Sequence, residues 1–287
     1  MTSDFQKITI LGAGVLGGSL ALATNRLAHP PAVSLWARRA DSVDEALRLG
    51  LSHATTDLKE AISAAELLVL AVPVGVMPDL VKAAVESGLP DSCLITDVGS
   101  VKSTPHESLA PLLAELPNAF IGSHPMAGSE QTGLGAATSD LFEGAACILT
   151  NDSDAPGPAA EKLERFWKSV GCRTTWMGAL AHDELVAKIS HLPHILAASA
   201  ARICLKDHTL GDFSGGGLRD TTRIASGNPS MWAEILTENR QAIIGPLRET
   251  IDDLREILAT LEAAELETAQ RWLSTAKQQR DTLAQSR

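Results

Sequence analysis

The sequence predicts an α/β protein in which a doubly wound sheet is followed by an all-helical C-terminal domain. A G-x-G-x-x-G pattern at residues 12–17 directly follows a short apolar run at residues 7–11. Apolar runs then alternate with helical patterns up to residue 178, and no clear strand pattern follows residue 181. Repeated strand–helix units form a parallel sheet with helices on both faces. We therefore expect two domains, at residues 1–178 and 179–287.

The elements can be predicted in order from apolar runs, helical spacing and turn residues. Strands are expected at residues 7–11, 32–36, 66–72, 92–98, 119–122, 146–150 and 173–177. Helices are expected at residues 15–27, 42–49, 57–63, 77–86 and 159–170. The second domain should hold a helix at residues 181–205 with a kink at Pro193, a glycine-rich loop at 207–217 and a helix at 231–244. Pro246 is then expected at the start of a helix that runs almost to the C-terminus.

That last helix carries an apolar seam. Leucine or isoleucine recurs at spacings of four, three, four and three residues, at Leu247, Ile251, Leu254, Leu258 and Leu261. This heptad-like pattern is typical of helices that pack along one another. Packing within the chain explains the seam, but a long helix ending a small helical domain also suits subunit association. We favour a homodimer formed through the C-terminal helices.

The glycine pattern predicts dinucleotide binding, with a purely structural turn as the alternative. Gly12 permits the tight turn, Gly14 lets a pyrophosphate approach the backbone, and Gly17 lets the helix pack closely on the strand. Val15 and Leu16 complete the motif at the helix start, where free N–H groups and the helix dipole favour an anion. With a strand before it and a helix after it, the motif indicates a Rossmann-like domain.

The second strand predicts the kind of dinucleotide. An enzyme that uses NAD usually has an acidic residue at the end of this strand, where it bonds the ribose 2′-hydroxyl. Here Ala37, Arg38 and Arg39 stand at that corner, and no carboxylate precedes Asp41. Two guanidinium groups suit a 2′-phosphate because arginine is planar and always charged. We therefore expect NADP to be preferred over NAD, with two solvated surface arginines as the alternative.

Composition excludes several classes of protein. The formal net charge is −11 and no block of Lys and Arg is long enough to bind nucleic acid. The longest apolar run, residues 67–77, is interrupted by Pro73 and is too short to cross a membrane. The four cysteines are scattered, as in a reducing compartment, and no signal peptide is expected. We expect a cytoplasmic protein, and the absence of tyrosine excludes acid–base chemistry by that side chain.

The chemical centre is expected at His124. It lies in residues 121–130, a segment rich in Gly, Pro and Ser that also holds Glu130, and we expect this segment to be a surface loop. Ligands of a parallel sheet bind at the carboxyl ends of its strands. Residues 72–73 (Val72 and Pro73), residues 98–102 and His124 all follow predicted strands. Three strand ends should therefore converge on one crevice.

The predicted second domain carries further polar groups. His191 and His194 are three residues apart, but no third ligand of suitable spacing is near, so we expect no metal site. They are either partly buried histidines bonded to the backbone or substrate contacts. Residues 215–223 combine three glycines with Arg219, Asp220 and Arg223. This segment is either a solvated helix end or an anion site in which arginine holds a carboxylate.

Five segments, in this order, resemble the prephenate/arogenate dehydrogenases of tyrosine biosynthesis. They are residues 12–19, 97–102, 122–130, 190–194 and 215–223, and the resemblance covers the chain from about Lys7 through the C-terminal helices. The glycine-rich turn is generic, whereas residues 123–128 and 215–223 are much more specific. The chain resembles the single-function form, without a fused chorismate mutase or a regulatory domain.

This resemblance implies oxidative decarboxylation, with hydride passing from the ring carbon that bears the 4-hydroxyl to NAD(P) while the ring carboxylate leaves as CO2. It also implies a role for each matching residue. His124 matches the catalytic histidine that accepts the hydroxyl proton, and Ser100 matches the serine that orients it. The matching substrate contacts are Arg223 for a carboxylate, His194 and Ser190 for the ring or side chain, Glu130 and Asp220 at the entrance, and Trp232 beside the substrate. Members that prefer NAD have an acid where this chain has Ala37, which strengthens the expectation of NADP.

Several alternatives stay open. The substrate is prephenate, arogenate or both, as in cyclohexadienyl dehydrogenases; the neutral Gln131 favours prephenate slightly. A β-hydroxyacid dehydrogenase would share the two-domain plan but needs a catalytic lysine, for which Lys188 is the candidate by position. A dinucleotide-sensing regulator without turnover would bind NADP and show no rate.

Overall fold

The computed structural model describes residues 3–128 and 131–284 of the chain. Its internal contacts divide it into two units, residues 1–240 and 241–287. The first unit contains the sheet and the helices that follow it, and the second contains the last two long helices. The domain boundary expected at residue 178 falls at the N-cap of helix α7, inside the first unit, and it stays a prediction.

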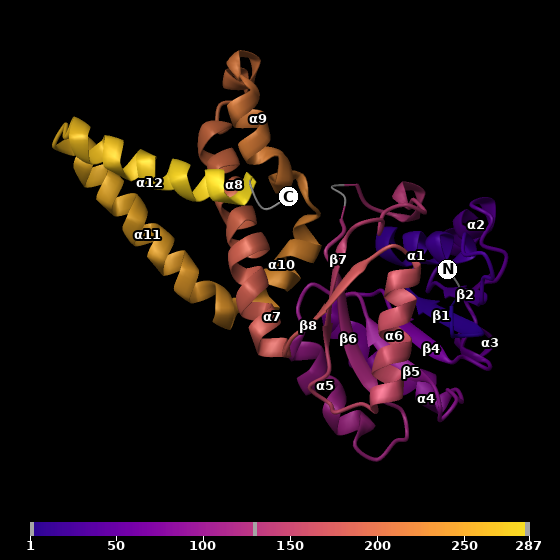
Figure 1. The fold of residues 1–287 in the computed structure, drawn as a ribbon. Coiled ribbons are helices and arrows are strands. Elements are labelled where there is room, and N and C mark those ends of the chain that lie inside the picture. Colours follow the sequence, from indigo (N-terminus) through magenta and orange to yellow (C-terminus); the bar gives the residue numbers. More distant parts are fainter. Residues whose placement is uncertain (1–2, 129–130, 285–287) are drawn as a thin grey trace. The chain divides into compact units, whose positions relative to one another are not determined.

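The N-terminal part is a single eight-stranded sheet with the order β3-β2-β1-β4-β5-β6-β7-β8 (Figure 1). Its strands are β1 (Lys7–Leu11), β2 (Ala32–Trp36), β3 (Ala54–Thr55), β4 (Leu67–Leu70), β5 (Leu94–Asp97), β6 (Phe120–Pro125), β7 (Ala146–Thr150) and β8 (Arg173–Trp176). Apolar side chains fill β1 and β4 almost continuously because both faces are covered. The expected Rossmann-like fold, followed by helices, is confirmed.

The sheet is mixed, so the expectation of a wholly parallel sheet is wrong at one pairing. β6 runs antiparallel to β7, with His124 opposite Ile148. A parallel neighbour requires a crossover, usually through a helix. Where the structure describes the connection at residues 126–145, the only helical element is the short 3₁₀ turn Leu134–Ala136. The chain therefore returns alongside β6 in the opposite direction.

Helices cover both faces of the sheet (Figure 1). One face packs against α1 (Val15–Asn25), α2 (Ala40–Arg48) and α6 (Gly157–Ser169), and the other against α3 (Leu58–Ile62), α4 (Met77–Glu86) and α5 (Ser103–Leu113). All the helices predicted for this part are present. The sequence analysis missed β3, which has only two residues, and α5, which contains two prolines. Both elements depend on neighbours in space more than on local pattern.

The helix expected at residues 181–205 forms with an irregular turn. It consists of α7 (Ala179–Val186), a π-helical turn (Ala187–His191) and α8 (Leu192–Cys204). The π-helical turn ends just before Pro193, where the sequence predicts that the helix is broken or kinked. Proline has no N–H to donate to the carbonyl group four residues earlier, so regular helical bonding is interrupted here.

Shorter elements complete the first unit. A 3₁₀ helix (His208–Phe213) occupies part of the expected glycine-rich loop. It is followed by α9 (Gly216–Thr222), a 3₁₀ turn (Arg223–Ser226) and α10 (Pro229–Glu238). Helix α10 is capped by the side chain of Asn228, which accepts hydrogen bonds from the backbone N–H groups of Ser230 and Met231. The helix expected at residues 231–244 therefore starts earlier, at Pro229. It also ends earlier, at Glu238.

The second unit corrects the prediction of one long C-terminal helix. Pro246 lies inside α11 (Arg240–Glu262) and does not start it, and α12 (Leu266–Ala284) is separate. Ala264, between them, has a positive φ of 54°, a conformation that ends a helix. The seam predicted on α11 lies on this helix; Leu247 is half-buried, and the other four residues are exposed, from 40% at Ile251 to 66% at Leu261. Among the described residues, no helix is long and apolar enough to cross a membrane.

Gly12 offers a test of the turn on which the first strand–helix unit depends. Its φ is +121°, and a Cβ atom there would lie 2.2 Å from the carbonyl oxygen of Ala71. We expect Gly12→Ala to lower the free energy of unfolding by about 3 kcal/mol or more, because strain and overlap add. Urea-induced unfolding followed by circular dichroism measures this change.

Gly14→Ala is the matched control. Gly14 has a φ of −100°, and a Cβ atom there would meet nothing within 4 Å. At this N-cap position we expect a cost of about 1 kcal/mol or less. Equal stabilities of the two variants would contradict the assignment of strain to Gly12.

Candidate active site

His124 lies inside strand β6 and is buried, with 7% of its surface exposed. The expectation of a surface loop is therefore wrong. The composition of residues 121–130 indicated a loop, but β7 pairs with this stretch and covers it. His124 is the last residue but one of β6, so it stays close to the carboxyl end of the strand, as expected. Its catalytic role remains a prediction.

Two residues of α7 approach His124. The Nδ1 atom of His124 lies 2.8 Å from Nε2 of His182, and Nδ1 of His182 lies 2.8 Å from Oδ1 of Asp183. All three side chains are buried. The sequence analysis missed both α7 residues. The only sequence signal is an adjacent His–Asp pair just past the last strand, and spacing alone could not connect it to β6.

Asp183 also fixes the loop that contains Ser100. Its Oδ1 atom accepts the backbone N–H of Lys102 at 2.8 Å, and its Oδ2 atom accepts that of Ser103 at 2.9 Å. These are orphan donors at the start of α5, so the carboxylate caps that helix. Ser100, half-buried, lies two residues before this anchor, after the end of β5. Ser100 thus lies where the sequence predicts it, just after the end of β5, the strand that pairs with β6.

A second buried carboxylate lies beside the first. Asp97 forms a fully buried ion pair with Lys102 and accepts the backbone N–H groups of Gly99 at 2.8 Å and Ser123 at 3.2 Å. These bonds connect β5 directly to β6 next to His124. A buried charge is tolerated when an opposite charge and hydrogen bonds compensate for lost water. The ion pair therefore holds the loop at residues 98–102 against the strand that carries His124.

Burial sets the protonation of these groups. Burial, followed by unfavourable electrostatic interactions with His182, Lys102 and His191, holds the pKa of His124 well below its usual value. Burial also lowers the pKa of His182, although Asp183 opposes this effect. Burial by itself would raise the pKa of Asp183, but hydrogen bonds from His182 and Ser103 lower it. Near neutral pH the site holds a carboxylate and two neutral imidazoles.

Asn239, which follows α10, connects the hydrogen-bonded residues His124, His182 and Asp183 to His191. Its Nδ2 atom donates to the backbone oxygen of Asp183 at 2.9 Å and to Nδ1 of His191 at 3.0 Å. His191 in turn contacts the edge of Trp232. His194 stacks on Trp232 with ring centroids 3.5 Å apart and an interplanar angle of 8°. The structure thus brings His124, His194 and Trp232 into one connected group.

Two polar atoms in this group are buried without a partner in the part of the chain that the structure describes. They are Nε2 of His191 and Nδ1 of His194. Because Nδ1 of His191 accepts from an amide, its proton is on Nε2, where a buried donor is left unsatisfied. Burial lowers the pKa of His191 to about 4, so the ring is neutral. Orphaned polar atoms of this kind fit a site that binds a polar ligand.

The remaining predicted substrate residues lie around this group with less definition. Ser190 is half-buried in the π-helical turn, one residue before His191. Arg223 and Asp220 are exposed at the end of α9 and the start of the 3₁₀ turn, elements that pack on α8. Gly227, which ends that turn, fits closely against Trp232, because a Cβ atom there would lie 2.4 Å from the indole nitrogen. Glu130 lies outside the described residues.

The predicted cofactor residues lie at the turn between β1 and α1 and after strands β2 and β4. A Cβ atom at Gly17 would lie 2.0 Å from the Gly12 oxygen, so helix α1 touches the turn, whereas the space at Gly14 is open. Val15 and Leu16 form the first turn of α1, which has no side-chain cap, so its backbone donors can receive a phosphate. Arg38 and Arg39 are exposed after β2, and Val72 and Pro73 follow β4. The chain's own residues therefore fit a dinucleotide.

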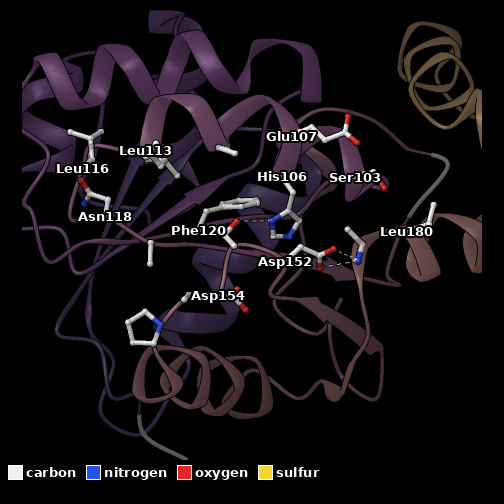
Figure 2. A pocket seen from close by; sticks show the side chains of 17 residues that line it. Ser103, His106, Glu107, Leu113, Leu116, Asn118, Phe120, Asp152, Asp154 and Leu180 are labelled. Carbon is white, nitrogen blue, oxygen red and sulfur yellow. Dashed lines mark hydrogen bonds between the residues drawn. The ribbon is translucent and has the colours of Figure 1, made fainter.

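A cavity of about 700 Å³ opens elsewhere on the same unit. Figure 2 shows its lining along α5, the loop that holds Asp152 and Asp154, and Leu180 of α7. His106 lies within it and bonds Thr150 at 2.8 Å and Ser153 at 3.0 Å. None of the predicted site residues that the structure describes lines this cavity. Over the same residues, no group of three or more His, Cys, Asp or Glu side chains is suited to a metal ion.

Two family models match consecutive parts of the chain. The prephenate dehydrogenase nucleotide-binding domain matches residues 20–176, and the prephenate dehydrogenase dimerization domain matches residues 179–275. Cyclohexadienyl dehydrogenase of Zymomonas mobilis is 35% identical over 260 residues, covering 88% of this chain and 87% of the relative. Prephenate dehydrogenase of Bacillus subtilis is 34% identical over 288 residues, covering 96% and 76%.

Solved structures agree. The crystal structure of Aquifex aeolicus prephenate dehydrogenase with hydroxyphenyl propionate and NAD+ superposes with a TM-score of 0.88 at 26% identity, covering 99% of this chain and 100% of that one. Synechocystis arogenate dehydrogenase superposes with a TM-score of 0.79 at 26% identity, covering 96% and 99%. The resemblance predicted from five sequence segments is thereby confirmed, and the chain belongs to the prephenate dehydrogenase family.

Proposed function

We propose that the chain catalyses the oxidative decarboxylation of prephenate to 4-hydroxyphenylpyruvate, with hydride transfer to NAD(P), in tyrosine biosynthesis. The observation that carries this proposal is His124, a buried neutral imidazole at the carboxyl end of β6 in a member of this family. A dinucleotide bound at the Gly12–Gly17 cradle supplies the hydride acceptor. The other roles belong to residues of the chain.

His124 acts as the base for the 4-hydroxyl group. A neutral imidazole accepts the hydroxyl proton as the hydride leaves the same carbon, so that the C–O bond becomes a carbonyl. Loss of the ring carboxylate as CO2 then returns an electron pair to that oxygen, which takes the proton back as the ring becomes aromatic. Ser100, on the loop held by Asp183, orients the hydroxyl group. Each proton and electron pair is accounted for within this sequence.

Substrate contacts come from the helices of the first unit. Arg223 holds a substrate carboxylate through paired hydrogen bonds. His194 and Ser190 contact the substrate ring or side chain, and Trp232 lies beside the substrate. The stacking of His194 on Trp232 and the orphaned Nδ1 atom of His194 support this arrangement. Glu130 and Asp220 belong to the entrance in this proposal.

Prephenate is the favoured substrate, with arogenate or both compounds as the alternatives. The named relatives include a prephenate, a cyclohexadienyl and an arogenate dehydrogenase, so the family spans these choices. An arogenate specialist gains from a carboxylate aimed at the substrate ammonium, and Gln131 is neutral. The rival β-hydroxyacid dehydrogenase would depend on Lys188, which is exposed on the π-helical turn.

NADP is the proposed preference within NAD(P). The exposed pair Arg38 and Arg39 follows β2 at the corner where the ribose 2′-position is read, and Ala37 is buried there. Two guanidinium groups favour a 2′-phosphate. The solved Aquifex relative contains NAD+, so the proposed preference is based on Arg38 and Arg39 of this chain and not on that relative.

A cytoplasmic homodimer with domains at residues 1–178 and 179–287 completes the proposal. The second family model is a dimerization domain, and the exposed leucines of α11 give it an apolar surface. No helix in the described part of the chain is able to span a membrane. Small-molecule turnover requires neither nucleic acid nor a membrane.

The reaction and its base are tested together. With the native chain, the absorbance of NADPH should rise when prephenate is added. His124→Asn should bind the cofactor normally and lose about 100- to 10,000-fold in kcat. His106→Asn, another buried histidine of the same sheet domain, should retain its kcat. Turnover with neither prephenate nor arogenate would end the proposal, and full kcat in His124→Asn would remove the base.

The cofactor preference has its own test. The native chain should show a higher kcat/KM with NADP than with NAD. Replacing Arg38 and Arg39 together by alanine should lower that ratio about tenfold or more, because charge-assisted hydrogen bonds to the phosphate are lost. Arg48→Ala, an exposed arginine at the other end of α2, is the control and should leave the ratio unchanged. A native preference for NAD would contradict the prediction.

The dimer is tested on the exposed seam of α11. Leu254 and Leu258 are 50% and 54% exposed. Replacing both by glutamate places charges in a contact that would lose water, so the sedimentation coefficient should fall to that of one 30.2 kDa chain. Glu256→Ala, on the same helix, should leave the assembly intact. A native chain that sediments as a monomer would contradict this part of the proposal.

A further inference from the structure

His124, His182 and Asp183 form a linear chain of hydrogen bonds shielded from water. The two links are each 2.8 Å long, and the exposed fractions of the three residues are 7%, 0% and 5%. The chain connects β6 to α7, 58 residues apart in sequence. Nothing in the resemblance or in the matched family descriptions assigns a role to either α7 residue.

The direction of every bond in this chain follows from its carboxylate end. An ionised carboxylate only accepts, so Nδ1 of His182 must donate to Asp183. A neutral His182 then has its lone pair on Nε2, which must accept from Nδ1 of His124. The proton of neutral His124 is therefore on Nδ1, and the lone pair is on Nε2. Nε2 is the atom with which His124 can act as a base.

Further hydrogen bonds hold the carboxylate of Asp183 in one orientation. Its two oxygens are held by the backbone N–H groups of Lys102 and Ser103, at 2.8 Å and 2.9 Å. The start of α7 is fixed as well, because Asp152 accepts the backbone N–H of Ala179 at 3.0 Å. His182 therefore projects from a helix that is anchored at its start and at the carboxylate.

The geometry points to His182, backed by Asp183, as the positioning residue that sets the tautomer and the orientation of His124. This inference rests on the proposed function, since it gives His182 a role only if His124 is the base. His182 does not touch the substrate in this proposal; it acts through His124. An imidazole whose second nitrogen is fixed in this way needs no reorganisation when it accepts a proton.

Asp183 favours a proton on the neighbouring His182, whereas burial and Lys102 oppose a proton on His124. When Nε2 of His124 takes up a proton, the Nδ1–H group of His124 still donates to His182, and the charge of Asp183 lies one ring further away. Lys102 opposes the positive charge on His124, and its ion pair with Asp97 offsets part of this effect. The helical residue His191 also faces the group and is neutral. Asp183 is therefore the anion that is hydrogen-bonded to this pair of imidazoles, through His182.

The experiment compares two substitutions of His182, each in the native chain and in the His124→Asn variant. His182→Phe removes the acceptor but keeps a ring of similar size. His182→Gln keeps an acceptor oxygen near the position of Nε2 but cannot hold a proton. For each variant we would measure kcat, the KM for prephenate and the Kd for NADP, and use thermal melting to check folding. His182→Met replaces His182→Phe if the latter does not fold.

We expect His182→Phe to lower kcat about ten- to a hundredfold, with little change in KM or in the Kd for NADP. His182→Gln should recover most of that loss. In the His124→Asn background, His182→Phe should cause no further loss of kcat, because the residue it positions is already absent. A role in stability alone would instead lower kcat by the same factor in both backgrounds, and that result would overturn the inference.

The outcomes separate this inference from the proposed function. If His182→Phe keeps its full kcat while His124→Asn loses most of its kcat, the positioning role is overturned and His124 remains the base. Full kcat in His124→Asn would remove the base, and the inference would fall with it. Unequal effects of His182→Phe in the two backgrounds, with recovery in His182→Gln, would support both.

Discussion

The carboxylate of Asp183 is the group on which the arrangement of the site depends. Taking a carboxylate out of water costs several kcal/mol or more unless its oxygens are fully bonded. Here it accepts two backbone N–H groups at the start of α5 and one imidazole N–H. Those three donors fix the loop before α5, the ring of His182 and, through that ring, His124. The buried carboxylate of Asp183 thus caps α5 and also ends the chain of hydrogen bonds that leads to His124.

A neighbouring ion pair leaves that charge available to the histidines. Lys102 and Asp97 form an ion pair in the same buried region, so Asp97 offsets part of the effect of the Lys102 charge on the two histidines. The two imidazoles between Asp183 and the substrate side are neutral because burial lowers the pKa of each. A lysine in the place of His182 could not accept a hydrogen bond. Histidine is the residue that can both accept from one neighbour and donate to the next.

The parts of the structure that depend on local pattern were predictable, and those that depend on tertiary contacts were not. The glycine turn and the alternating strands and helices follow from short-range sequence. His124 was recognised, but its loop was expected at the surface because the strand that covers it begins 22 residues later, at Ala146. His182 and Asp183 went unpredicted for the same reason, since Asp183 meets its partner Lys102 across 81 residues. In the second unit, the helix break at Ala264 was not predicted, because no glycine or proline lies next to it in the sequence.

This division has a chemical consequence. The hydride acceptor is held by backbone geometry that a few glycines specify, and many dehydrogenases share that geometry. The proposed proton acceptor, His124, depends on contacts between β6, α5 and α7, which no short motif specifies. A glycine motif therefore indicates that a chain binds a dinucleotide, but not which bond it oxidises. That second property depends on which group is aimed at the substrate proton, and here the direction of the hydrogen bonds from Asp183 to His124 assigns the lone pair to Nε2.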